Sequence, residues 1–150
     1  MISFSIGNFM FELDHRLKSD CVEIGSLSLC KILLMKDANY PWLILVPQRQ
    51  DVTELYELDG DDQEQFIWES SFVAERLMNG YQGDKMNIGA LGNVVPQLHI
   101  HHILRKKTDA AWPNPVWGAV PPKAYKPNEL SQRIEQLAKF FESSTFTPNR

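Results

Sequence analysis

The amino-acid sequence predicts an α+β domain built on an antiparallel sheet with helices flanking it. Its 150 residues fit one domain, which at this length buries roughly two thirds of its unfolded surface without disulfide or metal staples. Short apolar runs between turn residues predict strands, and apolar residues at helical spacing predict helices. The resulting order of helix, strands, helix, strands and helix is typical of an α+β domain.

The first half of the chain begins with a predicted helix and two strands. Asn8 is a suitable N-cap, and apolar residues recur behind it at helical spacing: Phe9, Leu13 and Leu17. The apolar runs 27–35 and 42–46 are strand-sized, and the polar residues 36–41 between them predict a turn. Because a parallel crossover needs about a dozen residues or more, these two strands are expected to pair antiparallel.

A longer helix and a histidine-bearing strand follow. The acids of residues 59–62 predict a helix start, and the helix is expected to end near Gly80. Its apolar stripe includes three core candidates: Phe66, Val73 and Leu77. A Gly-rich connector, residues 87–93, then leads into an apolar segment over residues 94–104 that carries histidines.

The last quarter of the chain is expected to form a separate part. Prolines at 113, 115, 121 and 122 argue against regular structure there. A final helix is expected behind Asn128, with an apolar stripe: Leu130, Ile134, Leu137 and Phe141. We therefore divide the chain into a main domain, 1–112, and a Pro-rich connector with a C-terminal helix packed on that domain, 113–150.

Composition narrows the classes of partner and compartment. A net charge of −4 and a pI of about 5.5 argue against binding of duplex nucleic acid, which needs clustered Lys and Arg, but leave a small nucleotide open. Cys21 and Cys30 cannot form a disulfide framework or a four-sulfur zinc site, and are expected to be buried thiols. The chain shows no secretory signal and no apolar run of membrane-span length, so we expect a cytoplasmic protein without a membrane partner.

The segment 97–105 carries the strongest functional signal. Side chains alternate between the faces of a strand, so Gln97, His99 and His101 should share one face. The other face is apolar apart from His102, which is therefore expected to face the core rather than act in catalysis.

Three interpretations of the histidine row compete. The two imidazoles could be half-exposed strand residues without a function. They could be metal ligands, although a site needs three or four ligands and no carboxylate stands nearby on the strand. One neutral imidazole could instead attack phosphorus while its neighbour assists the leaving group. The glycines and asparagines of residues 87–93 favour the third, because backbone N–H groups at glycines and side-chain amides bind anions.

The pattern of residues 87–105 resembles the signature of the histidine triad (HIT) superfamily. The stretch reads Asn87-x-Gly89, then Gly92-Asn93, then Gln97-Leu98-His99-Ile100-His101, and ends on Arg105. The resemblance covers residues 1 to about 112 and implies a five-stranded antiparallel sheet and a homodimer. Gln97 departs from the pattern because it stands at the first histidine position, and the loop before it looks one residue shorter than usual.

The resemblance also implies roles for single residues. His99 falls on the nucleophile, and His101 on the histidine that contacts the scissile phosphate and assists the leaving group. Gln97 joins them as a positioning residue that cannot titrate. The remaining positions are implied to bind substrate: Asn87, Gly92 and Asn93 at the phosphate, and Asp37 at the ribose hydroxyls.

The implied activity is hydrolysis at the α-phosphorus of a nucleotide through a covalent nucleotidyl-histidine. Dinucleoside polyphosphates and nucleoside phosphoramidates are the leading substrates, and the sequence does not choose between them. No cofactor or protein-bound metal is expected, although Mg²⁺ would accompany a polyphosphate. Two alternatives stay open: a nucleotide sensor with little turnover, and a metal-dependent hydrolase that uses His99 and His101 as ligands. An indole of the segment 112–118 could stack on the base, or the segment could only clamp the tail.

Overall fold

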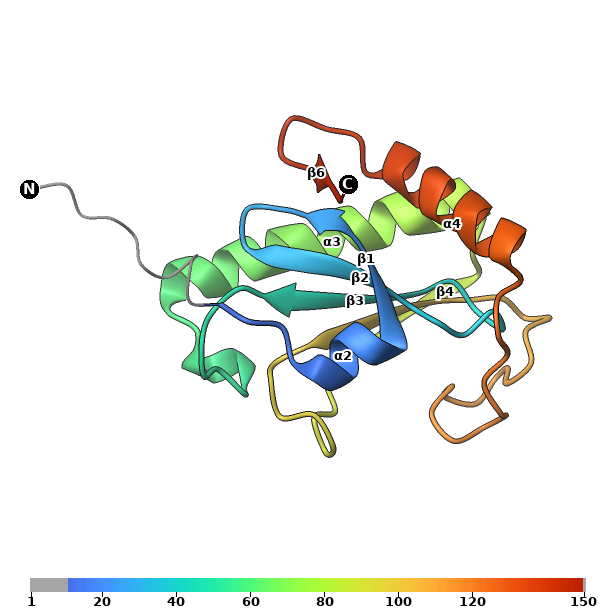
Figure 1. Cartoon of the computed structure of the whole chain (residues 1–150), viewed down its shortest axis with the longest axis horizontal. Coiled ribbons are helices and arrows are strands. Elements are labelled where there is room, and N and C mark those ends of the chain that lie inside the picture. The colour runs from blue at the N-terminus through green and yellow to red at the C-terminus, as the bar shows by residue number, and fades with distance from the viewer. Residues whose placement is uncertain (1–10, 150) are drawn as a thin grey trace, which may run out of the picture.

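A six-stranded antiparallel sheet forms the centre of the molecule in the computed structural model, which describes residues 11–149 (Figure 1). Its spatial order is β4-β5-β3-β2-β1-β6, and every neighbouring pair is antiparallel. The strands are β1 (Cys21–Ser26), β2 (Cys30–Met35), β3 (Trp42–Pro47), β4 (Lys85–Gly89), β5 (Ile100–Arg105) and β6 (Thr147–Pro148). The α+β class and the antiparallel β2–β3 pair are confirmed.

The sheet has six strands within residues 11–149, where five were expected. The additional strand is explained by β6, which is two residues long and pairs with β1 through Gly25 opposite Pro148. A Cβ at Gly25 would overlap the Thr147 carbonyl, so glycine is needed for this close approach. No apolar alternation marks so short a strand, and a proline within it is atypical of one.

Helices cover both faces of the sheet (Figure 1). The long α3 (Gly60–Tyr81) and α4 (Pro127–Phe140) pack on one face. The short α2 (His15–Asp20) and the irregular segment 106–122 pack on the other. A 3-10 turn, η1 (Leu55–Glu57), precedes α3. The core therefore consists of two clusters on opposite sides of the sheet.

The main helix α3 follows the pattern of its sequence. The Asp59 side chain caps it by accepting from the Asp62 backbone N–H (2.8 Å), and acids fill the first turn, where the helix dipole favours them. The helix ends at Gln82, which adopts a left-handed conformation (φ 54°). Its buried stripe packs onto the sheet: Phe66, Glu69, Ser70, Val73 and Leu77.

The other two helices begin at different residues from those expected. The cap of α2 is Asp14, whose side chain accepts from the Arg16 backbone N–H, while Asn8 and Phe9 lie outside the described residues. The last helix begins at Pro127 rather than behind Asn128, with the proline at the first helical position, where its missing N–H is harmless. Leu137 of this helix is fully buried in the core.

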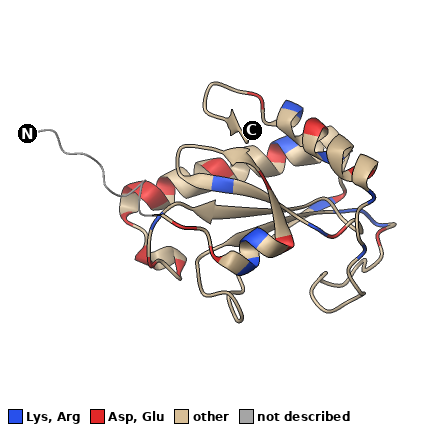
Figure 2. Cartoon of the chain, viewed as in Figure 1, with Lys and Arg blue, Asp and Glu red and all other residues tan. Residues whose placement is uncertain are grey.

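The remaining expectations from composition concern the cysteine thiols, membrane-spanning helices and the distribution of charged side chains. Cys21 and Cys30 are buried and unpaired, and burial raises the pKa of the Cys21 thiol to about 12. No helix within residues 11–149 is long and apolar enough to cross a membrane. Acidic side chains gather around η1 and the start of α3, whereas Lys and Arg are scattered over separate elements (Figure 2).

Candidate active site

Strand β5, between β4 and β3, presents its histidines on opposite faces of the sheet. His101 pairs with Ile44 of β3 and Gly89 of β4, on the face covered by α2 and the segment 106–122. His102 points the other way, toward α3. The alternation expected from the sequence therefore separates the two rings.

His102 is bound within the core. Its Nε2 lies 2.7 Å from the Ser70 hydroxyl, and its Nδ1 lies 3.1 Å from the Ile100 carbonyl oxygen. The residue is completely buried. Both ring nitrogens are satisfied, so His102 ties β5 to α3 and has no free nitrogen for chemistry.

His99 lies immediately before β5 and is held by its own segment. Its Nδ1 is 2.7 Å from the carbonyl oxygen of Gln97. A carbonyl oxygen only accepts hydrogen bonds, so Nδ1 carries the hydrogen and the neutral ring has its lone pair on Nε2. The Nε2 of neutral His99 therefore carries the lone pair that a nucleophile or a hydrogen-bond acceptor needs.

His101 has the opposite tautomer. The Trp42 indole N–H donates to His101 Nδ1 over 2.9 Å. An indole nitrogen is only a donor, so Nδ1 is unprotonated and neutral His101 carries its hydrogen on Nε2. The His99 and His101 ring centroids lie 5.1 Å apart. The lone pair on His99 Nε2 and the hydrogen on His101 Nε2 therefore belong to adjacent rings.

The environment of His101 and His102 keeps both rings neutral. The pKa of each ring is lowered to about 4, mainly by burial, and at His101 the neighbouring His99 and His102 contribute to the lowering. Neutral imidazole is the form that the tautomer assigned to His101 requires.

A pH dependence of stability follows from these two pKa values. Between the ordinary value of 6.5 and about 4, the unfolded chain binds protons that the folded chain refuses. The free energy of unfolding should therefore fall as pH falls through this window. Urea unfolding at about pH 7 and about pH 5 checks this, and NMR titration of the imidazole protons identifies the rings. Midpoints near 6.5 for both rings would contradict the buried neutral state.

The Gln97 side chain is directed away from the histidines, toward the segment before α2. Its Oε1 accepts from the Asp14 backbone N–H (2.8 Å), and its Nε2 donates to the Glu12 carbonyl (2.9 Å). Arg16 holds the same loop by donating to the Val94 carbonyl (2.8 Å). The amide therefore fixes the loop before His99 to the start of α2, while the Gln97 backbone carbonyl sets the His99 tautomer.

A Gln97→Ala change separates these two functions. It removes the two side-chain bonds and keeps the carbonyl, so we expect a loss of about 1–3 kcal/mol in unfolding free energy. We expect kcat to change by less than about tenfold. Denaturant unfolding and steady-state kinetics measure the two quantities. A collapse of kcat with unchanged stability would place the amide in the chemistry.

Two glycines shape the surroundings of the histidine pair. Gly89 lies opposite His101, and a Cβ there would come within 3.3 Å of the Trp117 ring, which itself lies 5.3 Å from the His101 ring. Gly92 has a left-handed φ of 72° and lines a cavity of about 20 Å³ beside His99. The neighbouring Asn93 is exposed in the same loop.

Asn87 lies on β4 on the same side of the sheet as His101. Arg105 Nη1 donates to its Oδ1 (2.8 Å), which leaves the amide NH₂ as the group free to donate. Arg105 is itself fixed by two bonds to the Asp109 carboxylate (2.8 and 3.0 Å) and is 1% exposed. The orientation of the Asn87 amide is therefore set by a buried ion pair.

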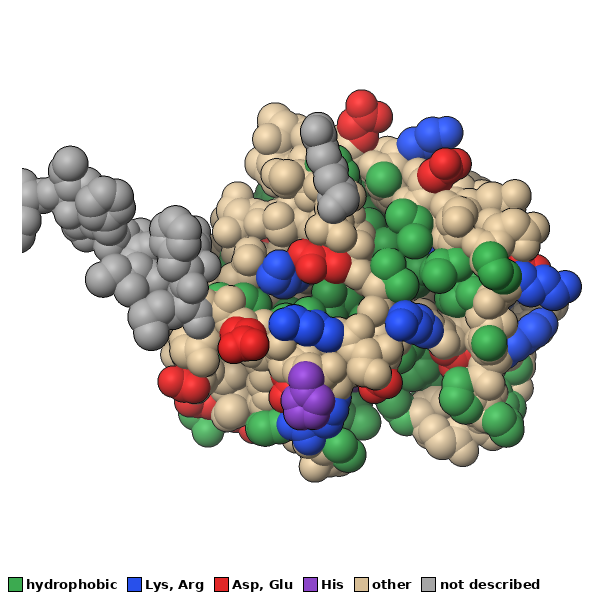
Figure 3. All heavy atoms as spheres, in the orientation of Figure 1, with side chains coloured by type: hydrophobic (Ala, Val, Ile, Leu, Met, Phe, Trp, Pro, Cys, Tyr) green, Lys and Arg blue, Asp and Glu red, His purple; other side chains and the backbone are tan. Residues whose placement is uncertain are grey.

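A cavity of about 470 Å³ lies on the other side of the two tryptophans that contact His101. Trp42 and Trp117 line it, together with Asp37, and the surface is hollowed between α2 and the segment after β5 (Figure 3). The Asp37 carboxylate is nearly buried, and its Oδ1 accepts from the backbone N–H groups of Asn39 and Lys123. The volume lies in the range of small-molecule sites.

The site gathers some predicted residues and adds others. His99, His101 and the Asn87 amide share one side of the sheet, whereas the Gln97 amide does not. Within residues 11–149, no group of three His, Cys, Asp or Glu side chains is placed to hold a metal ion. Sequence reasoning missed Trp42, Arg105 and Asp109. The opposite charges of Arg105 and Asp109, four residues apart, were a local signal that the sequence offered.

Comparison with known proteins identifies the fold and the family. The HIT domain matches residues 16–108. A histidine triad protein of Bradyrhizobium japonicum is 48% identical, with 88% of this chain and 98% of that chain covered and a TM-score of 0.86. A histidine triad protein of Marinobacter aquaeolei is 45% identical, covering 88% and 96%, with a TM-score of 0.85. One of Sinorhizobium meliloti is 42% identical, covering 88% and 98%, with a TM-score of 0.85. A search of curated proteins gives no match. The chain belongs to the histidine triad (HIT) family, whose members are generally nucleotide-binding hydrolases or transferases.

Proposed function

We propose that the chain is a nucleotide phosphohydrolase in which His99 attacks the α-phosphorus and forms a covalent nucleotidyl-histidine. The supporting observation is the opposite polarity of the two adjacent rings. A lone pair stands on His99 Nε2 because the Gln97 carbonyl binds Nδ1, and a hydrogen stands on His101 Nε2 because Trp42 binds Nδ1. We infer a nucleotide as the substrate from membership of the HIT family.

The reaction proceeds in two displacements. In the first, the His99 Nε2 lone pair forms a bond to phosphorus, and the bond from phosphorus to the leaving group breaks with its electron pair. The Nδ1–H bond to the Gln97 carbonyl stabilises the positive charge that the ring acquires. In the second, water attacks phosphorus, the phosphorus–nitrogen bond returns its pair to Nε2, and the water proton passes to solvent.

His101 acts in this mechanism as a neutral hydrogen-bond donor. Protonation of its Nδ1 would break the bond from the Trp42 indole, which cannot accept a hydrogen. While His101 Nδ1 stays unprotonated, loss of the proton on Nε2 would leave the ring as an imidazolate anion. His101 therefore stabilises charge on the phosphoryl group or the departing oxygen without transferring its proton.

The role proposed for His101 favours one of the two substrate classes, phosphoanhydrides and phosphoramidates. A polyphosphate leaves as a stable anion and needs no proton, whereas an alkylamine departs well only when protonated. We therefore propose a phosphoanhydride, such as a dinucleoside polyphosphate, rather than a phosphoramidate as the preferred substrate. The 470 Å³ cavity would hold the nucleoside, with Asp37 near the ribose and an indole of Trp117 or Trp42 at the base. Asn87, Gly92 and Asn93 would contact phosphate oxygens.

The function is tested with a panel of dinucleoside polyphosphates and nucleoside phosphoramidates, measuring both affinity and products. We expect a nucleoside monophosphate as product and faster turnover of the anhydrides. Binding across the panel without turnover would replace the enzyme by a nucleotide sensor. Loss of phosphoramidate hydrolysis on EDTA treatment, with one metal ion per chain restoring it, would favour the metal-dependent mechanism.

We also propose that the chain forms a homodimer through the β4 edge of its sheet. β4 has no partner strand on its outer side within residues 11–149. Ile88 on that edge is 52% exposed. Ile67 on α3 is 62% exposed and lies about one helical turn before Ser70, which contacts His102 of β5. Such apolar side chains beside an open edge favour pairing with a second copy. Sedimentation analysis of the chain and of an Ile88→Asp variant tests this: a monomer in both would contradict it.

A further inference from the structure

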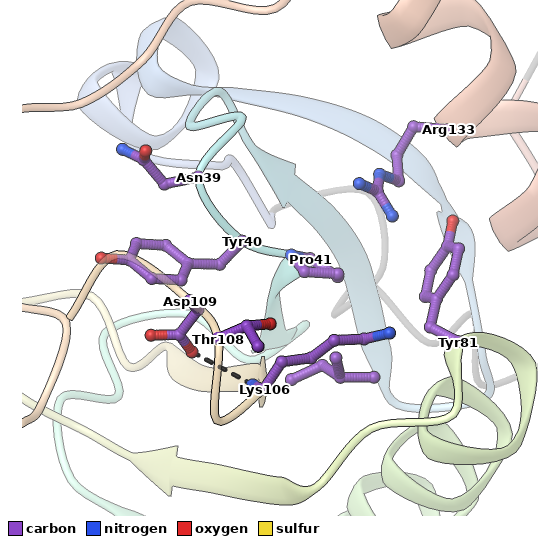
Figure 4. Close-up of a pocket in the computed structure, with 9 residues that line it drawn as sticks. Asn39, Tyr40, Pro41, Tyr81, Lys106, Thr108, Asp109 and Arg133 are labelled. Atoms are coloured by element: carbon purple, nitrogen blue, oxygen red, sulfur yellow. Dashed lines mark hydrogen bonds between the residues drawn. The ribbon is translucent and has the colours of Figure 1, made fainter. Parts of the chain in front are cut away.

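A second cavity lies at the end of the sheet, away from the histidine pair. It has a volume of about 360 Å³ and is bounded by the β2–β3 loop, the end of β5, the end of α3 and α4 (Figure 4). Neither His99 nor His101 lines it. Its lining residues are Asn39, Tyr40, Pro41, Tyr81, Leu104, Lys106, Thr108, Asp109 and Arg133.

Two cations enter this cavity from different elements. Figure 4 shows the Lys106 ammonium and the Arg133 guanidinium both directed toward the space beside Pro41 and Tyr81. Within residues 11–149, neither has a carboxylate oxygen within 4.0 Å. The nearby Asp109 does not neutralise them, because its carboxylate is occupied by Arg105 and by three backbone N–H groups.

Arg133 is fixed in place by aromatic side chains. Its guanidinium carbon lies 4.6 Å from the Tyr81 ring centroid, and the Tyr81 hydroxyl is held by donating to Gln136 (2.8 Å). The guanidinium is a planar group with several N–H donors, and Arg uses such a pair of donors to bind phosphate.

An adjoining cavity of about 380 Å³ shares Arg133 and adds further polar groups. Lys123 and Tyr125 line it, and the buried Tyr125 hydroxyl has no hydrogen-bond partner within residues 11–149. A buried hydroxyl without a partner is unfavourable unless a ligand or water binds it. Lys123 contributes a third cation. Glu129 is the one acid that lines this 380 Å³ cavity.

We infer that these two cavities form a second binding site, for a small organic phosphate whose phosphate group lies between Lys106 and Arg133. The anion would supply a partner for two cations that have no carboxylate oxygen within 4.0 Å among residues 11–149. Pro41 and Leu104 give the apolar part of the ligand a surface to pack on. A volume of 360 Å³ exceeds what a bare phosphate needs and fits a ligand with a carbon skeleton.

The site is connected to the proposed substrate cavity through one short segment. The Lys123 backbone N–H donates to Asp37 (3.2 Å), and its carbonyl accepts from Ala38 (2.7 Å). Ala38 and Lys123 line the 380 Å³ cavity, whereas Asp37 lines the 470 Å³ cavity. Arg133 lines both cavities of the proposed site, so the site adjoins the segment that fixes Asp37.

The test uses phenylphosphonate, which has an apolar ring, a phosphonate dianion and no bond that the enzyme hydrolyses. Titration of the isotope-labelled full chain should give saturable amide shifts centred on Leu104, Lys106, Thr108 and Arg133. Lys106→Gln and Arg133→Gln should each weaken binding about tenfold or more. Lys139→Gln, an exposed cation on the same α4 helix, is the matched control and should leave the Kd within about twofold.

Other results would overturn the proposal. Shifts centred on residues 87–101, with a Kd unchanged in both Gln variants, would mean that the anion binds only at the histidine site. Equal binding of the uncharged benzyl alcohol would mean that the cavity is simply apolar. Because His99→Ala should leave phenylphosphonate binding intact, failure of this site and failure of the proposed hydrolysis are separate outcomes.

Discussion

Replacing His99 by alanine is expected to lower kcat about a thousandfold or more, which corresponds to at least about 4 kcal/mol of lost transition-state stabilisation. The side chain touches its own segment through one bond to the Gln97 carbonyl, so its removal should leave the fold intact. Activity on the preferred substrate and denaturant unfolding of the same preparation measure the two properties.

His15→Ala is the matched control for this variant. The His15 side chain is 87% exposed on α2, so its loss should change neither activity nor stability. If His99→Ala kept more than about a tenth of the wild-type kcat, less than 1.4 kcal/mol would have been lost and His99 would not be the nucleophile.

Replacing Asp109 by alanine is expected to reduce the free energy of unfolding by about 3–5 kcal/mol, because it leaves the buried Arg105 guanidinium without its partner. Asp109 also accepts from the backbone N–H groups of Lys106, Ala111 and Trp112, so the turn after β5 loses its anchor. The Arg105 guanidinium also packs near the rings of Tyr40 and Trp112. Neither ring can replace the carboxylate that the variant loses.

Two further measurements separate this ion pair from a general surface effect. Glu135→Ala, at an exposed acid of α4, should change stability by less than about 0.5 kcal/mol. The double variant Arg105→Met, Asp109→Leu should cost less than Asp109→Ala alone, since no buried charge is left unpaired. A small loss in Asp109→Ala, within 1 kcal/mol, would contradict the role assigned to the pair.

The same pair makes stability sensitive to acid. Burial raises the pKa of Asp109, but bonds from Arg105 and three backbone N–H groups outweigh it and hold that pKa at about 2. Because the unfolded carboxyl has a pKa near 3.8, the unfolded chain takes up a proton first as pH falls. The stabilisation is therefore present above about pH 4 and is lost as pH falls toward 2.

The elements set by local pattern were predictable from the sequence. The acids at 59–62 and the stripe of Phe66, Val73 and Leu77 predict α3, and the short polar turn predicts the antiparallel β2–β3 pair. The alternation across β5 predicts that His102 lies on the opposite side from His101. These features follow from spacing along one segment, which the chain displays directly.

The features set by contacts between distant residues were not predictable. The Trp42 indole and His101 are 59 residues apart in the chain, and no periodicity indicates that they meet. Gln97 was expected to face its neighbouring histidines, but its amide finds backbone partners 83 and 85 residues away. The strand β6 forms because Gly25 admits it, which is a property of the assembled sheet. A tertiary contact thus decided the His101 tautomer, whereas the His99 tautomer follows from a carbonyl only two residues away.

The central claim is that His99 becomes covalently attached to the nucleotide during turnover. Rapid mixing with a dinucleoside polyphosphate, acid quench and peptide mass spectrometry test it most directly. The account predicts a nucleotidyl adduct on His99 in the wild type and in Gln97→Ala, and none in His99→Ala. Turnover without an adduct at any quench time, or an adduct on His101 instead, would contradict it.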